Sequence, residues 1–263
     1  MLKYIVSLIA ILLAITANAE PVTAESFLVT DLEGNVISQK YPNRTQSIAS
    51  ITKLMTAIVV LDKHQDLDEE ILLNWKNARK YHTQLPRNMQ SLTRRELLEL
   101  AIVKSDNFAA YTLCENYPEG VTACVADMNQ TADNLKMYNS RFTDPTGLEE
   151  TNVSTAKDLI KLVMQADNYP ELQAATKPEV SIKFKKKWWE FKNTNPLVGK
   201  SKANVIISKT GYIRRSGGCI VMEIETNYGT RIIALLGSKN TRTRIPEAEQ
   251  IVLKVSGHDI AVE

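Results

Sequence analysis

The stretch SIASITKLMTA (residues 47–57) carries the pattern that decides both the fold and the chemistry of this chain. Its apolar residues recur at helical spacing and predict a helix over residues 51–64 with one buried stripe. Ser50 and Lys53 lie on a different face, three residues apart and therefore one helical turn from each other. A lysine amine at that distance can accept a serine proton, so the pair is a candidate nucleophile and base. The stripe consists of Ile51, Leu54, Met55, Ile58 and Val59.

The same spacing recurs at Ser154 and Lys157, so it carries little weight by itself. There, Ser154 and Thr155 are typical residues for the start of a helix, and Asp158 would complete a capping box. At the first copy, by contrast, Ser50 and Lys53 share a face of the predicted helix that differs from its apolar stripe. We therefore assign chemistry to Ser50 and a capping role to the second copy.

Both ends of the chain predict antiparallel strands. Residues 27–40 contain two short apolar runs around a Gly-Asn turn, which is typical of a hairpin. Three more such runs, at residues 205–213, 219–226 and 230–236, are separated by glycine-containing turns. We expect an α+β fold of the β-lactamase/transpeptidase-like type, in which a five-stranded antiparallel sheet is flanked by helices and a helical lobe is inserted between its strands. Further helices are predicted at residues 93–104, 107–116, 155–165 and 246–255.

The first residues predict a secretory signal peptide. Residues 1–3 give a positive start, residues 4–15 are apolar, and Ala17-Asn18-Ala19 supplies the small residues after which signal peptidase cleaves. The apolar run is shorter than the roughly 20 residues that span a bilayer. We expect residues 1–19 to be removed. Residues 20–263 would form one catalytic domain that works outside the cytoplasm, most simply in a periplasm, with no integral membrane segment.

Composition excludes several classes of protein. The 32 Lys and Arg residues nearly balance the 30 Asp and Glu residues, which does not predict a nucleic-acid partner. The three histidines have no second ligand type at metal spacing, so neither a metal nor a cofactor is expected. Three cysteines are too few for a disulfide scaffold. The sequence leaves open whether Cys114 and Cys124 form a disulfide.

Two further motifs follow in order, Ser105-Asp106-Asn107 and Lys209-Thr210-Gly211. The ordered set S-x-x-K, S-D-N and K-T-G is far more specific than any one member, and it is a known signature of active-site serine enzymes that react with penicillin. With FTDPTGL (142–148), NTNP (193–196) and SKTGY (208–212), the chain closely resembles the low-molecular-mass penicillin-binding proteins. These are serine peptidases of the D-alanyl-D-alanine carboxypeptidase and endopeptidase family. The resemblance covers residues 27–238.

The resemblance implies catalytic roles for three residues. Ser50 would attack the D-alanyl carbonyl of a peptidoglycan stem peptide, neutral Lys53 would be the general base, and Ser105 would relay a proton to the leaving amine. Lysine is a poor base at its ordinary pKa of about 10.4, so Lys53 needs burial or a like-charged neighbour. Lys209 would supply that charge if the strand lies beside the helix. β-Lactams would acylate the same serine and act as covalent inhibitors.

Five residues are implied to bind the substrate. Asn107 would hydrogen-bond its peptide group, and Lys209 and Thr210 would hold its polar or carboxylate groups. Gly211 would let the substrate backbone approach the strand closely. The backbone N–H of Tyr212 would form the oxyanion hole together with that of the catalytic serine.

Positive charge near the presumed cleft departs from the family pattern. Lys104 precedes the S-D-N motif, and Arg214 and Arg215 follow the K-T-G motif. These charges could favour an anionic stem peptide, but most charge runs are solvated, and that is the interpretation we favour. The run KFKKKWW (183–189) leaves a similar choice. Its aromatic residues could rest on a glycan, or belong to an exposed strand whose apolar side is buried.

Other functions fit the sequence less well. A class A β-lactamase would carry E-x-x-L-N between Ser105 and Lys209, and Glu149 and Glu150 do not fit that pattern. A non-catalytic cell-wall binding protein would be expected to have lost a motif residue, and none is lost. The chain ends soon after the predicted sheet, without the C-terminal β domain and anchor helix common in membrane-attached carboxypeptidases of the family. This favours an endopeptidase that cuts the D-alanyl to diamino acid cross-link.

The contrast between the two S-x-x-K copies gives a direct test. We expect labelled penicillin to mark the protein covalently, the Ser50→Ala variant to lose the label and the Ser154→Ala variant to keep it. Mass spectrometry of the labelled protein measures this. A label that survives Ser50→Ala would contradict the assignment of the nucleophile.

Overall fold

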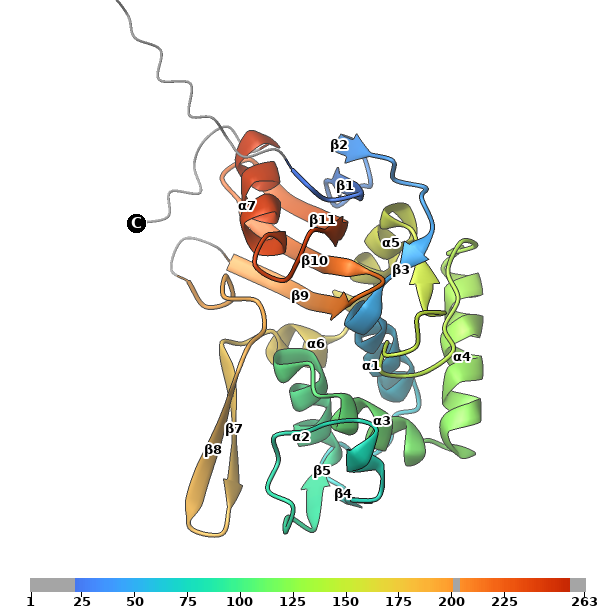
Figure 1. Ribbon diagram of the computed structural model, residues 1–263, viewed down its shortest axis with the longest axis vertical. Coiled ribbons are helices and arrows are strands. Elements are labelled where there is room, and N and C mark those ends of the chain that lie inside the picture. Colours follow the sequence, from blue (N-terminus) through green and yellow to red (C-terminus); the bar gives the residue numbers. More distant parts are fainter. Residues whose placement is uncertain (1–21, 201–203, 256–263) are drawn as a thin grey trace, which may run out of the picture.

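The computed structural model describes residues 22–200 and 204–255 of the chain (Figure 1), so the expected signal peptide lies outside the described residues. Its centre is a five-stranded antiparallel sheet in the order β2-β1-β11-β10-β9, which confirms the predicted sheet. Strand β1 from near the start of the chain pairs with β11 from near its end. The strands are β1 (Ser26–Thr30), β2 (Val36–Lys40), β9 (Asn204–Ile213), β10 (Gly217–Thr226) and β11 (Gly229–Ser238).

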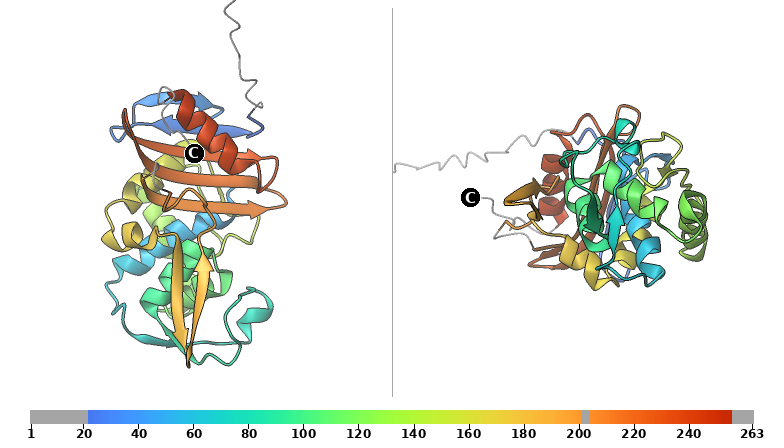
Figure 2. Two further views of the ribbon diagram at one scale, coloured as in Figure 1. Left: turned by 90° about the vertical axis from the view of Figure 1, so that its left-hand side faces the viewer. Right: turned by 90° about the horizontal axis from the view of Figure 1, so that it is seen from below.

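Helices cover both faces of this sheet (Figures 1 and 2). Helix α7 (Arg244–Val255) lies on one face, and α5 (Ala156–Ala166) lies on the other. Side chains alternate along a strand, so Ile220 and Met222 of β10 pack in the cluster with α7 while Val221 packs in the larger core. The sheet therefore contributes apolar surface to two cores.

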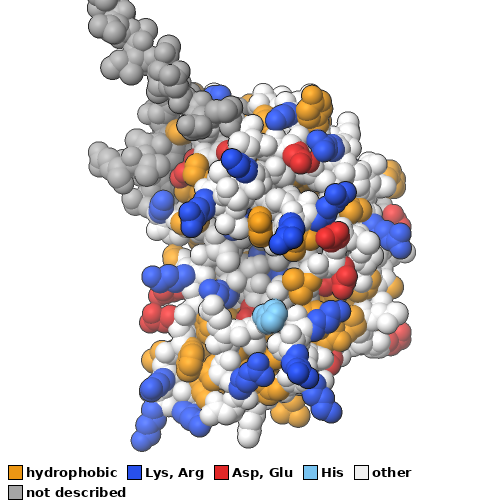
Figure 3. Space-filling view, viewed as in Figure 1, with side chains coloured by type: hydrophobic (Ala, Val, Ile, Leu, Met, Phe, Trp, Pro, Cys, Tyr) orange, Lys and Arg blue, Asp and Glu red, His pale blue; other side chains and the backbone are white. Residues whose placement is uncertain are grey.

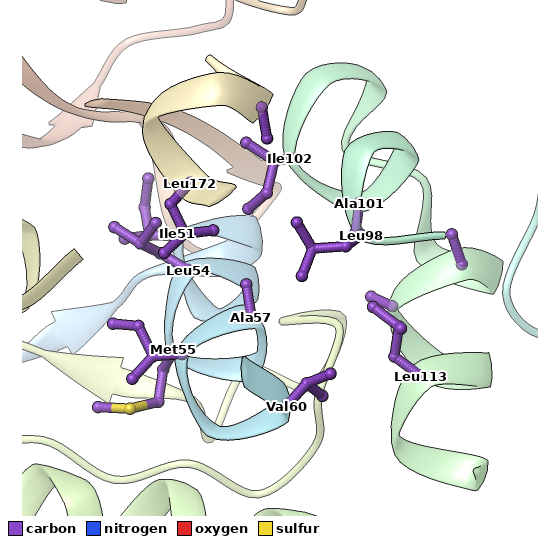
Figure 4. Packing of buried hydrophobic residues seen from close by; sticks show 14 of the residues in the cluster. Ile51, Leu54, Met55, Ala57, Val60, Leu98, Ala101, Ile102, Leu113 and Leu172 are labelled. Atoms are coloured by element: carbon purple, nitrogen blue, oxygen red, sulfur yellow. The ribbon is translucent and has the colours of Figure 1, made fainter. Parts of the chain in front are cut away.

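Helix α1 (Thr52–Asp62) follows a short 3₁₀ turn, η1 (Ala49–Ile51), and runs through the middle of the larger core. All its residues from Thr52 to Leu61 are buried. The sequence predicted burial of one apolar stripe only, whereas the helix is buried on every side. An α-helix that is apolar around its circumference belongs inside a protein rather than on its surface. Figure 4 shows Leu98 and Ile102 on the side of their segment that faces α1.

The predicted helix at residues 93–104 is present, but it changes character along its length. Thr93 and Glu96 form the expected capping box at the start of α2 (Arg94–Glu99). The segment then continues as a π-helix, η3 (Leu100–Lys104), and α3 (Asn107–Glu115) begins after a sharp turn. This turn carries the S-D-N motif.

The second S-x-x-K copy caps a helix as expected, with one difference. The Thr155 hydroxyl accepts from the backbone N–H of Asp158 at the start of α5. The second bond of a capping box, from the backbone N–H of Thr155 to the Asp158 carboxylate, is not formed. That carboxylate accepts from the backbone N–H of Asn139 and the hydroxyl of Ser140 instead. Only half of the expected capping box forms.

Several elements were not predicted. Helix α4 (Gly120–Asn134) buries only Cys124, Met128 and Ala132, a stripe one residue wide and too thin to stand out in the sequence. Cys124 forms a disulfide with Cys114 of α3, which settles the question that the sequence left open. The smaller elements are η2 (Asn77–Arg79), α6 (Pro170–Ala175), the strand pair β3 (Gln46–Ser47) with β6 (Val153–Ser154), and the pair β4 (Glu70–Leu72) with β5 (Ser91–Thr93).

The basic and aromatic run is a hairpin and not a single strand. Strands β7 (Glu179–Phe184) and β8 (Lys187–Lys192) extend from the body of the molecule (Figure 1). Trp188 is 63% exposed and Trp189 is 37% exposed, so of the two alternatives left open by the sequence, a buried apolar side does not hold for these tryptophans. The buried residues of the hairpin are Val180, Ile182 and Phe191, and Val180 pairs with Phe191. Lysines gather over the hairpin tip, at the lower left of Figure 3.

The packing between α1 and α2 gives a stability prediction. Leu98 is 2% exposed in the larger core, whereas Leu72 of β4 is 76% exposed. We expect Leu98→Ala to lower the free energy of unfolding by about 2–5 kcal/mol, because the truncation leaves a cavity. Leu72→Ala should change it by no more than about 0.5 kcal/mol. Denaturant unfolding followed by circular dichroism compares the two, and equal effects would contradict this description of the core.

Candidate active site

The backbone around Ser50 is held between two glycines. Ala49 has a left-handed backbone, with φ of 47°. A Cβ at Gly147 would lie 2.0 Å from the Ala49 carbonyl oxygen, and a Cβ at Gly211 would lie 2.8 Å from the Ile48 carbonyl oxygen and 3.1 Å from the Ser50 nitrogen. A larger residue at either position would displace this backbone. Gly211 therefore lets the backbone of η1 approach β9 closely. The sequence analysis expected this glycine to admit the substrate backbone and did not predict the contact within the chain.

Lys53 of α1 is fully buried and has three hydrogen-bond partners. Its Nζ lies 2.7 Å from the Ser50 hydroxyl, 2.7 Å from Oδ1 of Asn107 and 2.7 Å from the Thr146 carbonyl oxygen. The first two belong to motifs identified in the sequence. The carbonyl belongs to the FTDPTGL segment, and a main-chain acceptor leaves no side-chain signal by which it could have been found.

Burial lowers the pKa of Lys53 to about 7. The carboxylates of Asp144 and Asp106 act in the opposite direction, because negative charge stabilises the ammonium form. Of the two alternatives that the sequence left open, burial is therefore the one that lowers the pKa of Lys53, and Lys209 is not among its causes. Lys209 is itself buried, and desolvation followed by repulsion from Lys53 and Arg244 holds its pKa well below the ordinary value.

The loop that supplies the Thr146 carbonyl is organised by one buried carboxylate. Asp144 accepts hydrogen bonds from the backbone N–H groups of Thr146 and Gly147, and from the side chain of Asn152. The Thr56 hydroxyl of α1 donates to the Pro145 carbonyl oxygen at 2.8 Å and ties the loop to the helix. The Lys53 environment therefore depends on a segment far from it in sequence.

The turn with the S-D-N motif places Asn107 beside Lys53. Asp106 caps α3 by accepting from the backbone N–H of Ala109, and its other oxygen accepts from the Thr83 hydroxyl. Ser105 has a left-handed backbone, with φ of 59°, a strained conformation for a residue with a side chain. Among the described residues, the Ser105 hydroxyl has no hydrogen-bond partner. It is a partly buried hydroxyl two residues from Asn107.

The K-T-G motif lies on β9, the strand that packs against η1. The Lys209 Nζ donates to the Thr210 carbonyl oxygen at 2.9 Å, and the Thr210 hydroxyl bonds to the Thr194 hydroxyl at 2.6 Å. Arg244 of α7 donates to the Gly211 carbonyl oxygen at 2.8 Å. The sequence analysis missed Arg244, because it lies outside every motif and reaches the strand only through the fold. Tyr212 is 47% exposed at the rim of the site.

The structure thus brings the three motifs to one place, with a serine hydroxyl, a buried amine and a cationic strand. Within residues 22–200 and 204–254, no group of three or more His, Cys, Asp or Glu side chains could hold a metal ion. A serine whose proton can pass to an amine of low pKa can form and hydrolyse an acyl-enzyme. These features define a serine enzyme of the acyl-transfer class.

The chain matches the family described as D-alanyl-D-alanine carboxypeptidase over residues 14–240, and it belongs to this family of serine-type peptidases. A D-alanyl-D-alanine endopeptidase of Pseudomonas aeruginosa is 37% identical over 86% of this chain and 75% of that protein. One of Escherichia coli is 34% identical over 90% of this chain and 79% of that protein. A D-alanyl-D-alanine carboxypeptidase of Bacillus subtilis is 26% identical over 80% of this chain and 56% of that protein.

Two solved structures share the fold. The Streptomyces K15 DD-transpeptidase has a TM-score of 0.80 and 24% identity, over 89% of this chain and 97% of that one. Penicillin-binding protein D2 of Listeria monocytogenes, solved in its ampicillin-bound form, has a TM-score of 0.76 and 24% identity. That match covers 90% of this chain and 98% of that one. β-Lactams therefore bind a protein of this fold.

The lowered pKa of Lys53 predicts a pH dependence. Protonated Lys53 has no lone pair to accept the serine proton, so we expect the acylation rate with penicillin to rise with pH to a plateau, with its midpoint near pH 7. Stopped-flow measurement of acylation across the pH range checks this. Lys53→Arg should lose several orders of magnitude at every pH, because a guanidinium stays protonated. A rate that is flat across neutral pH, or near wild-type acylation by Lys53→Arg, would contradict the role of Lys53 as base.

Proposed function

We propose that this protein is a peptidoglycan endopeptidase that hydrolyses the bond between D-alanine and a diamino acid in cross-linked stem peptides. The observation that carries the proposal is the set of partners around Lys53. A neutral amine has two N–H donors and one lone pair. The Asn107 and Thr146 oxygens can take the two donors, which leaves the lone pair for the proton of Ser50.

Acylation follows from this arrangement. The Ser50 oxygen attacks the D-alanyl carbonyl while its proton moves to Lys53, and the backbone N–H groups of Ser50 and Tyr212 stabilise the oxyanion. Ser105 takes the proton from Lys53 and passes it to the leaving amine; its hydroxyl has no hydrogen-bond partner among the described residues and is available for both bonds. Water then attacks the acyl-enzyme, with Lys53 as base again, and releases the shortened stem.

Substrate binding completes the proposal. Asn107 hydrogen-bonds the peptide group next to the scissile bond, and Lys209 and Thr210 hold the polar or carboxylate groups on the leaving side. Gly211 keeps the strand close to both the serine backbone and the substrate. The same groups orient a β-lactam carbonyl over Ser50, so we propose that β-lactams acylate this serine.

The preference for cross-links is supported by the relatives. The P. aeruginosa and E. coli proteins described as endopeptidases are 34–37% identical, against 26% for the B. subtilis carboxypeptidase. We also propose export to the periplasm by residues 1–19. Within residues 22–200 and 204–255, no helix is long and apolar enough to cross a membrane.

Digestion of purified peptidoglycan tests the proposed activity. We expect the enzyme to convert cross-linked muropeptide dimers to monomers faster than it removes terminal D-alanine from pentapeptides, because the leaving group of a cross-link is a diamino acid. Liquid chromatography of the muropeptides measures both reactions, with Ser50→Ala as the inactive control. Loss of terminal D-alanine without loss of dimers would identify a carboxypeptidase instead.

A further inference from the structure

A hollow whose lining contains none of the motif residues of the active site has a cavity volume of about 460 Å³. Segments from distant parts of the chain form its wall: the residue before β1, the segment leading into β3, the loop before β6 and the turn between β9 and β10. Four charged residues face it, Glu25, Arg44, Glu150 and Arg215. None of the motifs identified in the sequence includes any of them.

The hollow borders both catalytic segments of the chain. Ser47 lines it and lies three residues before Ser50 in the same segment. At the other side, Arg215 lies in the turn that follows β9, four residues after Gly211. Since Gly211 packs against the Ser50 backbone, a peptide that lies along β9 and continues past its end meets the hollow at Arg215.

The charges around the hollow are only partly paired. Arg44 forms an ion pair with Glu25 at 3.0 Å, with both side chains half exposed. Among the described residues, Arg215 and Glu150 have no ion pair and no side-chain hydrogen bond. The residues that precede these two in the sequence do not share this position. Glu149 forms an ion pair with Lys80, and Arg214 does not line the hollow. The hollow thus presents one unpaired positive and one unpaired negative side chain.

We propose that this hollow is a subsite for the free amino-carboxylate end of the diamino acid that precedes the scissile D-alanine in the acyl-donor stem, since the amine of the leaving diamino acid is part of the bond that is cut. Arg215 binds the carboxylate, for which a guanidinium offers two parallel N–H donors, and Glu150 binds the ammonium. A simple anion would be repelled by Glu150, whereas a zwitterionic group satisfies both side chains. The inference rests on the proposed function, and it names the part of the substrate that the enzyme recognises.

The test uses a cross-linked dimer of two tetrapeptide stems and two modified forms of it. In one form the free carboxylate of the donor stem's diamino acid is amidated, and in the other the free amine of that same diamino acid is acetylated. We expect each modification to lower kcat/KM of the wild-type enzyme by about fivefold, the upper end of the range for an exposed ion pair. Arg215→Gln should abolish the sensitivity to amidation, and Glu150→Gln should abolish the sensitivity to acetylation.

Arg214→Gln and Glu149→Gln are matched controls that should keep both sensitivities, because neither residue lines the hollow. A merely structural role of Arg215 would lower kcat/KM for every dimer and leave the ratios unchanged, which would overturn the proposal. Equal cleavage of modified and unmodified dimers by the wild-type enzyme would overturn it as well, while the proposed function stands. Failure to cleave any dimer while penicillin still acylates Ser50 would reject the endopeptidase function itself.

Discussion

The backbone of Ala49 and Ser50 passes between Gly147 and Gly211, where no side chain with a Cβ would fit. This close packing fixes the serine relative to the sheet on one side and to the Asp144 loop on the other. It also sets the start of α1, and with it the position of Lys53 one turn later. The site is therefore determined by main-chain contacts, and the reacting side chains depend on them.

Burial then sets the chemistry. Lys53 and Arg244 lie close enough to Lys209 to lower its pKa, and all three side chains are largely withdrawn from water. A buried ammonium is costly, so the amine that can lose its proton does so near neutral pH. Arg244 keeps its charge and gains the Gly211 carbonyl oxygen as a partner. Neutral Lys53 can act as the base for attack on a carbonyl, while the charge of Arg244 attracts carboxylates. The pair therefore suits a substrate that has both groups.

Much of the fold and of the candidate site could be predicted because their signals are local. Turn residues and alternating apolar runs gave all five strands of the sheet, and spacing gave Ser50, Lys53 and Asn107, which the structure brings into contact. What the sequence could not provide depends on long-range packing. The Thr146 carbonyl leaves no side-chain signal, and Arg244 reaches β9 only because α7 folds back on the sheet. The exposed Trp188 shows the same limit, since aromatic character alone could not decide between burial and exposure.

The pairing of β1 with β11 has a consequence for the order of events in folding. Contacts between the two ends of a chain form slowly, because they close the longest loops. The helices between residues 52 and 166 can pack as soon as they are synthesised, and Lys53 and Asn107 meet within that lobe. Strand β9, which completes the site around Ser50, comes later in the chain, and β11, which joins it to β1 through β10, comes later still. The ability to react is therefore the last property that the growing chain acquires, and a truncated product that retains Ser50 and Lys53 but lacks these strands would be inert.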